Sequence, residues 1–263
     1  MDDNKSIYET FYTQASFKLG GDSYSQAMHA MRFDLIERYG RDRDVLDVGC
    51  ATGEYLRPMV DITKSAIGLD YTQRFLDEFA AAYPSGLPSK LKLVCGDARE
   101  MPLPDASVDF AYSYATLYHV PAAERVVAEL GRVVRPGGHI AIEMGNQSSL
   151  NTLVSQAWHE AEDWARPCHA GLRQIARWLH DAGFEEEYRR VFQLLPMYAI
   201  PRRLWWVMPL SGVPLRSLLG RTTASGRLYD EMVSGLPGVR NFAFRHLIVA
   251  RRIAAVKVDA GTG

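Results

Sequence analysis

Short apolar runs recur at regular intervals along the middle of the chain, and the segments between them carry apolar residues at helical spacing. The runs lie at 45–49, 66–70, 91–97, 108–115 and 139–145. They are continuous rather than alternating, which is typical of strands buried on both faces of a parallel sheet. The other segments predict helices over 24–39, 53–60, 71–83 and 122–134. This alternation predicts a doubly wound α/β fold.

The rhythm changes after residue 145. Apolar spacing there predicts helices over 149–165 and 170–182 and strands over 185–195 and 241–252, for a total of seven mostly parallel strands. The segment between the last two strands is rich in proline, glycine, arginine and aromatic residues. We therefore expect an N-terminal helical cover (1–44), a core (45–195), a lid insertion (196–240), a final core strand (241–252) and a loose tail (253–263).

Composition removes several alternatives. The chain has 263 residues, 47% of them hydrophobic and 23% charged, and its formal net charge of -1 gives no support to nucleic-acid binding. The three cysteines, Cys50, Cys95 and Cys168, form no CxxC pair and no histidines have metal-ligand spacing, so we expect a reducing compartment and no metal. Neither a signal peptide nor the roughly 20 apolar residues of a spanning helix are found. We expect a cytoplasmic protein.

A glycine-containing loop, DVGCATGE (47–54), follows the first strand. Such a loop directs backbone N–H groups and the positive end of the next helix toward a ligand. A dinucleotide fingerprint would need glycines at 49, 51 and 54, but Ala51 and Glu54 occupy the last two positions. A carboxylate there would oppose a pyrophosphate, and the GK[ST] ending of a P-loop is absent. The loop therefore favours a ligand without phosphate.

Aspartates mark the ends of the first three strands. Asp70 lies about 20 residues beyond the first strand, where a carboxylate can accept both hydroxyls of a ribose. Asp97 is placed to accept a hydrogen bond from an exocyclic amine, and Asp47 can attract an ammonium. Taken singly, Asp70 could cap the following helix and Asp97 could be a turn residue. Together they favour a ligand that joins a nucleoside to an amino acid.

Four motifs now carry a resemblance: VLDVGCATG, GLDYT, CGDAREMPLPDASVDFAYSYATLYHV and LGRVVRPGGHIAIE. In order and spacing over about 45–145 they resemble the class I S-adenosylmethionine-dependent methyltransferases, in particular the small-molecule, methyltransferase type 11 group. Ala51 departs from the pattern, because the family more often has glycine there. The resemblance implies a Rossmann-like methyltransferase fold, a cofactor-binding core over 45–195 and S-adenosyl-L-methionine as the cofactor.

The resemblance also implies which residues bind the cofactor. They are Asp47, Gly49, Cys50, Ala51, Gly53, Asp70, Tyr71, Asp97, Ala98, Ser113, Tyr114, Tyr8 and Tyr12. The first five would form the loop around the methionine part, and the next four would hold the ribose and the adenine. Ser113 and Tyr114 would lie beside the sulfonium, and the two N-terminal tyrosines would close over the cofactor.

His119 follows the fourth strand and is the candidate catalytic base, because it lies near the expected reaction centre. A lone histidine at this position equally suits packing or capping of the next helix. Tyr118 and Tyr114 could instead line the pocket, where ring faces stabilise a sulfonium. Methyl transfer depends mainly on alignment of the two reactants, so a base is not required.

The insertion carries the question of the acceptor. Its tryptophans, Trp205 and Trp206, lie among several arginines and suit a lipid-linked acceptor with an anionic group, a peripheral membrane contact through 202–215, a packed cap or a homodimer surface. The main hypothesis is methyl transfer to an oxygen or nitrogen of a small metabolite, such as a natural product or a glycan-pathway intermediate. The alternatives are a lipid-linked or quinone-like acceptor at the membrane surface, a nicotinamide-dependent oxidoreductase and a non-catalytic cofactor binder.

Overall fold

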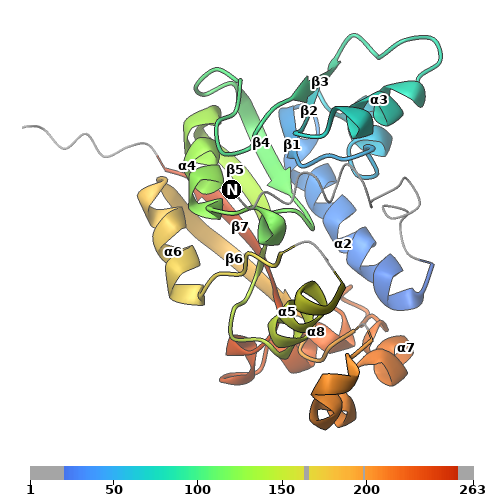
Figure 1. The fold of residues 1–263 in the computed structure, drawn as a ribbon. Helices are drawn as coiled ribbons and strands as arrows, with labels where there is room; N and C mark the ends of the chain where they lie inside the picture. The colour runs from blue at the N-terminus through green and yellow to red at the C-terminus, as the bar shows by residue number, and fades with distance from the viewer. Residues whose placement is uncertain (1–20, 163–165, 198, 254–263) are drawn as a thin grey trace, which may run out of the picture.

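Seven strands form one sheet at the centre of the molecule (Figure 1). The structure, a computed structural model, describes residues 21–162, 166–197 and 199–253. The strands are β1 (Asp44–Val48), β2 (Ser65–Asp70), β3 (Leu91–Cys95), β4 (Val108–Ser113), β5 (Val134–Gly145), β6 (Phe184–Phe192) and β7 (Arg245–Arg252). Their order is β3-β2-β1-β4-β5-β7-β6, and β7 runs antiparallel to both of its neighbours. The predicted α/β fold is confirmed.

Helices cover both faces of this sheet (Figure 1). On one face lie α2 (Ser23–Gly40) and α3 (Gln73–Ala81), and on the other α4 (Ala123–Val133) and α6 (Leu172–Asp181). Neighbouring strand residues pack into opposite cores, since Val45 joins the cluster under α2 and α3 while Leu46 joins the cluster under α4 and α6. Burial on both faces is the reason why the strands have continuous apolar runs. In the described ranges no helix has the length and apolar character needed to cross a membrane.

Two local predictions were wrong. The segment 53–60, expected to be a helix, forms turns followed by a 3-10 helix, η2 (Arg57–Ile62), because Pro58 lacks the N–H that a continuing α-helix needs. The fifth strand, expected to begin at residue 139, begins at Val134, so that the sequence RPGG at 135–138 lies inside β5. It forms an irregularity between the pairs Val108–Val134 and Phe110–His139, and Gly137 takes a φ of +84° there.

Helix α5 (Leu150–Glu162) follows β5, and short helices make up the insertion between β6 and β7. These are η4 (Arg202–Leu210), η5 (Val213–Leu215), α7 (Arg216–Leu219), α8 (Tyr229–Ser234) and η6 (Val239–Asn241). The insertion is attached to the start of α2: the Tyr24 hydroxyl donates to Asp230 at 2.6 Å, and Arg216 Nε donates to Asp22 at 2.9 Å. Gly220 allows close contact, because a Cβ there would lie 2.5 Å from the Tyr24 backbone.

Candidate functional site

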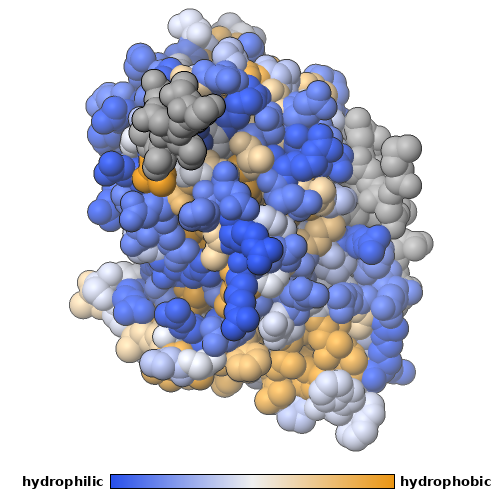
Figure 2. All heavy atoms as spheres, turned by 90° about the vertical axis from the view of Figure 1, so that its left-hand side faces the viewer, coloured by the Kyte–Doolittle hydropathy of each residue, from blue (hydrophilic) through white to orange (hydrophobic). Residues whose placement is uncertain are grey.

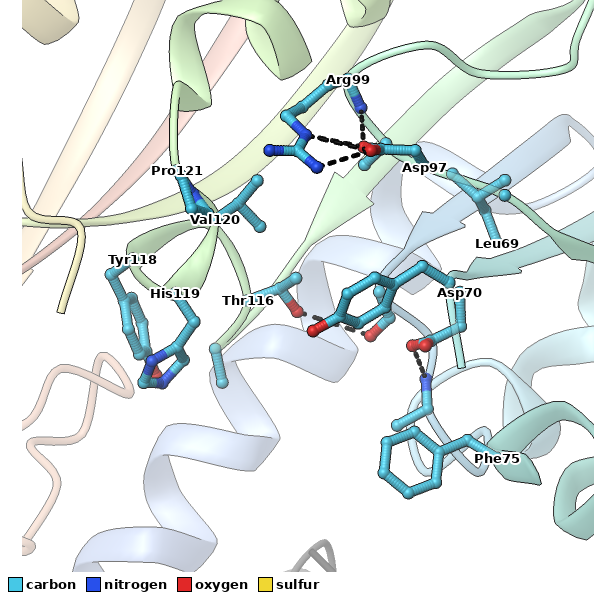
Figure 3. Close-up of a pocket in the computed structure, with 16 residues that line it drawn as sticks. Leu69, Asp70, Phe75, Asp97, Arg99, Thr116, Tyr118, His119, Val120 and Pro121 are labelled. Atoms are coloured by element: carbon cyan, nitrogen blue, oxygen red, sulfur yellow. Dashed lines mark hydrogen bonds and ion pairs between the residues drawn. The ribbon is translucent and has the colours of Figure 1, made fainter. Parts of the chain in front are cut away.

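A cavity of about 280 Å³ lies beyond the carboxyl ends of β1 to β4 (Figure 3). Its lining residues are Gly49, Ala51, Leu69, Asp70, Tyr71, Phe75, Gly96, Asp97, Ala98, Arg99, Ala115, Thr116, Tyr118, His119, Val120 and Pro121. The strand order reverses between β1 and β4, and this switch point is where open α/β sheets bind ligands. The cavity therefore occupies the position expected from the strand-end residues.

The loop after β1 is held in one shape by its glycines. Gly49 has a φ of +78°, and a Cβ there would lie 2.4 Å from the Thr116 side chain; Gly53 has a φ of +83°, and a Cβ there would lie 2.4 Å from the Phe79 ring. Backbone N–H groups of Gly49 and Cys50 donate to the Leu69 carbonyl at 2.8 and 3.0 Å. The loop is thus folded back onto the end of β2, and its bare backbone lines the cavity at Gly49.

Ala51 lies in the same loop with a φ of +45°, in the left-handed region that glycine adopts without strain. Its methyl group lines the cavity. The conformation gives a physical reason for the glycine that similar loops more often have here, and it means that this chain carries a small backbone strain at the site.

Asp70 ties the loop to the end of β2. Its carboxylate is only 7% exposed and accepts from the Ala51 N–H at 3.0 Å and the Thr72 N–H at 2.9 Å. Burial raises the pKa of Asp70. Thr72, rather than Asp70, is the N-cap residue of α3, so the capping alternative does not describe Asp70. This carboxylate faces the cavity, where a ligand could donate further hydrogen bonds to it.

Asp97 lies at another part of the cavity wall, in contact with a residue that the sequence reasoning missed (Figure 3). The Arg99 guanidinium donates to its carboxylate through Nη2 at 2.7 Å and Nε at 3.0 Å, and the Arg99 N–H also donates at 2.8 Å. These contacts lower the pKa of Asp97, so its carboxylate is ionised at neutral pH. The Asp-x-Arg spacing in the loop after β3 was the sequence signal for this pair.

The segment after β4 forms the remaining wall and includes the 3-10 helix η3 (Leu117–His119). His119 lines the cavity beside Tyr118, with ring centroids 4.6 Å apart (Figure 3). Burial lowers the pKa of His119 to about 3, and repulsion between a protonated His119 and the neighbouring His169 and Arg245 lowers it further. Its imidazole is therefore neutral at physiological pH, where it can accept a hydrogen bond but is a weak proton acceptor.

Several residues expected around the cofactor do not line the cavity: Asp47, Cys50, Gly53, Ser113 and Tyr114. The Cys50 thiol points into the core, where a Cβ at Gly68 would lie 2.9 Å from its sulfur. The Ser113 hydroxyl donates to the Val48 carbonyl at 2.8 Å and joins β4 to β1. Tyr8 and Tyr12 lie outside the described residues.

Tyr114 is buried and stacks on Tyr112 at 5.1 Å, so it belongs to the core under α2. Glu54 is also absent from the cavity wall, and its carboxylate accepts from the Thr52 hydroxyl. The electrostatic argument that placed Glu54 against a pyrophosphate is therefore not supported by its position.

Asp47 lies beneath the cavity and is 4% exposed. Burial raises the pKa of Asp47 well above its ordinary value, and the Asp70 and Glu54 carboxylates raise it further. Ionisation of this side chain therefore costs free energy in the folded protein, and a cation near the loop would reduce that cost.

A buried charge cluster supports the wall from behind. The Glu143 carboxylate accepts from Arg32 at 2.8 and 2.7 Å, from Arg245 at 2.8 Å and from the Ala115 N–H at 3.2 Å. Arg32 comes from α2 and Arg245 from the start of β7, so three distant segments meet behind Ala115. Their charges compensate in part for the cost of burial. Sequence reasoning could not find this cluster, because its members share no local motif.

Comparison with known proteins gives the family. A methyltransferase-domain family matches residues 46–142, the segment that contains β1 to most of β5. A Mycolicibacterium smegmatis protein named "probable S-adenosylmethionine-dependent methyltransferase" is 28% identical over 64% of this chain and 62% of its own length. The segment 46–142 thus carries a methyltransferase domain, and the relatives support a class I S-adenosylmethionine-dependent methyltransferase. Its family cofactor is S-adenosylmethionine, as predicted.

A second curated relative and a solved structure extend the comparison. A sterol 24-C-methyltransferase of Neurospora crassa is 35% identical over 46% of this chain and 33% of its own length. The chain thus spans less than two thirds of these curated relatives. The solved structure of an S-adenosylmethionine-dependent methyltransferase from Mesorhizobium loti superposes with a TM-score of 0.58, at 18% identity, over 89% of this chain and all of that one, and supports the fold.

The residues of the cavity fit the cofactor of this family. Two carboxylates, Asp70 and Asp97, meet a ligand with ribose hydroxyls, an exocyclic amine and cationic groups. At Gly49 a Cβ would collide with Thr116, so the backbone is bare where the loop faces the cavity. The carboxylate acceptors and the bare backbone of the cavity therefore match the hydrogen-bond donors and cationic groups of S-adenosylmethionine.

Proposed function

We propose that this methyltransferase transfers the methyl group of S-adenosylmethionine to an oxygen or nitrogen of a small metabolite by in-line displacement. The observation that carries the proposal is the single cavity in which the β1 loop, Asp70, Asp97 and the segment 115–121 meet. When bound, the cofactor supplies an electrophilic methyl group on its sulfonium. The bond from the acceptor atom to the methyl carbon would form while the carbon–sulfur bond breaks, with S-adenosylhomocysteine as the leaving group and the O–H or N–H proton of the acceptor released to water.

In this proposal each wall of the cavity holds one part of the cofactor. Asp70 accepts the ribose hydroxyls through the positions that Ala51 and Thr72 leave open. Asp97 and the Ala98 backbone hold the adenine edge, and Tyr71 packs on the ring. Gly49 and Ala51 present backbone to the methionine part, with Asp47 beneath them as a compensating carboxyl group.

The segment after β4 would position the acceptor. Alignment of reactants in a cavity supplies on the order of 7–11 kcal/mol in favourable cases, so binding and orientation are the main tasks of the chain. His119 accepts a hydrogen bond from the acceptor through its neutral imidazole and turns the reacting lone pair toward the methyl group. Its pKa of about 3 suits this positioning role better than full proton removal.

A lipid-linked or quinone-like acceptor is the second candidate. The observation that favours it is the exposure of Trp205, Trp206 and neighbouring apolar side chains on the insertion. The Neurospora crassa relative is named for a sterol carbon acceptor, so an acceptor screen should include amphiphiles and carbon acceptors beside water-soluble alcohols and amines.

Calorimetric titration with S-adenosylhomocysteine tests the cofactor site. We expect Asp70→Ala to weaken binding about 10- to 100-fold and Asp97→Ala about tenfold, because hydrogen bonds to charged groups contribute roughly 1.5–3 kcal/mol. Asp181→Ala, on the exposed end of α6, is the matched control and should leave affinity unchanged. Unchanged affinity in both site variants would show that the cavity is not the cofactor site. Tight NAD binding without S-adenosylmethionine binding would favour an oxidoreductase.

Release of S-adenosylhomocysteine from S-adenosylmethionine, measured across the acceptor screen, tests the reaction. His119→Gln keeps a hydrogen-bonding side chain but changes its shape and its acceptor geometry. We expect it to lower kcat while cofactor affinity stays the same. Normal turnover in this variant would assign His119 to packing, and no turnover with any acceptor class would favour a non-catalytic cofactor binder.

A further inference from the structure

Exposed apolar side chains gather on the insertion. In the described part of the chain, all of the exposed large apolar residues except Leu87 and Ile253 lie between 205 and 242. They are Trp205, Trp206, Met208, Leu210, Val213, Leu215, Leu218, Tyr229, Met232, Val233, Leu236 and Phe242. Figure 2 shows hydrophobic colour concentrated at the lower end of the molecule, where Figure 1 places α7 and α8. We call residues 202–242 the docking face.

The docking face is a fixed structure. Within this segment Val207 and Leu228 are almost fully buried on the inner side, and Asp230 joins the segment to Tyr24 of α2. Arg216 adds a second link to α2 by donating to Ser25 at 2.9 Å through Nη2. Since these anchors hold the inner side, the outer apolar side chains are exposed by the fold of the insertion itself.

The exposed charges on the docking face are all positive. They belong to Arg202, Arg203, Arg221, Arg227 and Arg240. The acidic residues of this segment, Asp230 and Glu231, are 1% and 4% exposed and lie on the inner side. Glu231 is occupied by Arg190, which donates to it at 2.6 Å. Arg203 is paired with the exposed Glu160 of α5 at 2.9 Å, and Arg227 lies 3.7 Å from Glu231. An approaching partner therefore meets apolar and aromatic side chains among arginines, with no exposed carboxylate between residues 202 and 242.

We infer that the docking face binds the surface of an anionic lipid bilayer. Tryptophan is favoured at the boundary between headgroups and acyl chains, where its ring is apolar and its N–H remains hydrated. Arginines beside it attract anionic headgroups, and buried apolar area adds to that attraction. The docking face has both components on one side of the molecule.

Charge favours a bilayer over a second copy of the chain. A two-fold symmetric dimer through this face would bring the same patch against itself. Arg202, Arg221 and Arg240 would then face arginines, because the acids between 202 and 242, Asp230 and Glu231, are buried and the exposed Glu160 beside the face is paired with Arg203. Like-charge contacts of this kind oppose association. None of the docking-face residues lines the cofactor cavity, so the inference does not depend on the proposed reaction.

Vesicle sedimentation of the full chain tests the inference. We expect binding to phosphatidylcholine vesicles that contain phosphatidylglycerol, little binding to phosphatidylcholine alone, and a loss of binding as salt is raised. The double variants Trp205→Ser with Trp206→Ser and Arg202→Glu with Arg221→Glu should each lower the partition coefficient by about tenfold or more. Two matched controls, Leu87→Ser and Arg177→Glu, alter an exposed leucine and an exposed arginine elsewhere and should bind as the wild type does.

Unchanged affinity of all variants for S-adenosylhomocysteine would show that each is folded. Failure of the wild type to bind the anionic vesicles would overturn the inference, and so would equal binding to both vesicle types. Light scattering tests whether a second copy of the chain binds this face instead. If the wild type is a dimer that does not bind vesicles, and the tryptophan variant is a monomer, the face is a dimer interface.

Discussion

The cofactor cavity and the docking face are built in opposite ways. At the cavity, acidic side chains such as Asp47 and Asp70 are buried and the loop backbone is fixed by steric contacts. On the docking face, arginines and tryptophans are exposed while the acids Asp230 and Glu231 lie beneath them. The first region must hold a small ligand at a fixed distance, so it needs tight packing. The second can function only if its apolar side chains are left unpacked.

The largest contrast concerns stability. Phe79 is fully buried against the Gly53 turn, whereas Trp205 is 72% exposed. We expect Phe79→Ala to lower the free energy of unfolding by about 3–5 kcal/mol. Trp205→Ala should change it by no more than about 0.5 kcal/mol, because an exposed side chain loses little on truncation. Urea unfolding measures both, and a large cost at Trp205 would mean that the docking face is packed in solution.

Acid should weaken the protein through histidines near the sheet, and the segment 199–244 has none. Burial lowers the pKa of His246 to about 3 and that of His169 to about 4, so both are neutral in the folded chain. The unfolded chain binds these protons near pH 6.5. The stability that depends on the neutral histidines is therefore complete above that pH and is lost as the pH falls toward 3–4. In this window each histidine lowers the free energy of unfolding by about 1.4 kcal/mol per pH unit.

His246→Gln isolates one of these groups. The Arg189 guanidinium lies 3.3 Å from its ring, and the charges of Arg189 and Arg240 oppose protonation, whereas the Ala243 carbonyl at 3.3 Å favours it. Between pH 6 and 4, we expect the slope of the unfolding free energy against pH to fall in this variant by the equivalent of about one bound proton. His180→Gln, at an exposed position of α6, is the control variant. Equal slopes in all three proteins would contradict the assignment.

Two buried aspartates should respond to the same substitution with opposite signs. Burial raises the pKa of Asp47, so its ionisation costs stability above pH 4, and Asp47→Asn should raise the unfolding free energy by about 1 kcal/mol at pH 7. The gain should vanish below pH 4, where Asp47 is neutral in both states. Asp230→Asn should destabilise by about 1 kcal/mol or more, because Tyr24, Ser234 and the Gln193 N–H all donate to that carboxylate.

Thermal unfolding at pH 7 and pH 3.5 measures this pair. A stabilised Asp230→Asn protein would mean that the hydrogen bonds to Asp230 do not stabilise the anchor of the insertion. A destabilised Asp47→Asn protein would mean that Asp47 is held by hydrogen bonds rather than opposed by burial.

The smallest expected effect is at Ala51. Glycine relieves the left-handed conformation at this position, so Ala51→Gly should stabilise the chain by about 0.5–1 kcal/mol. Ala128→Gly, at an exposed position in the middle of α4, is the control and should destabilise by about 1 kcal/mol. Calorimetric melting distinguishes the two signs, and destabilisation in both variants would show that the loop relaxes around Ala51.

Much of the cavity could be predicted because its residues directly follow strands. Continuous apolar runs located β1 to β4, and parallel strands bring their carboxyl ends to one edge, so Asp70, Asp97 and His119 were expected together. The side-chain directions could not be predicted. Cys50 and Ser113 lie in the right segments but point into the core, because one residue of shift along a loop or strand reverses the face.

Contacts between distant segments were also beyond the sequence. The cluster of Arg32, Glu143 and Arg245 joins positions that are 111 and 102 residues apart, and no local pattern marks it. The insertion was expected to hold acceptor specificity, while the structure attaches it to α2 through Tyr24 and Asp230. Which of its side chains are covered depends on this docking.

The sequence by itself determined the alternation of strands and helices, the glycine turn after β1 and the aspartates at the strand ends, because hydrophobic period and backbone conformation are local properties. Only the tertiary structure decided which of these side chains share the cavity, that Glu143 pairs with two buried arginines, and that the arginines and tryptophans of the insertion are exposed. Burial, charge pairing and exposure are properties of neighbours in space, and most of those neighbours come from elsewhere in the chain.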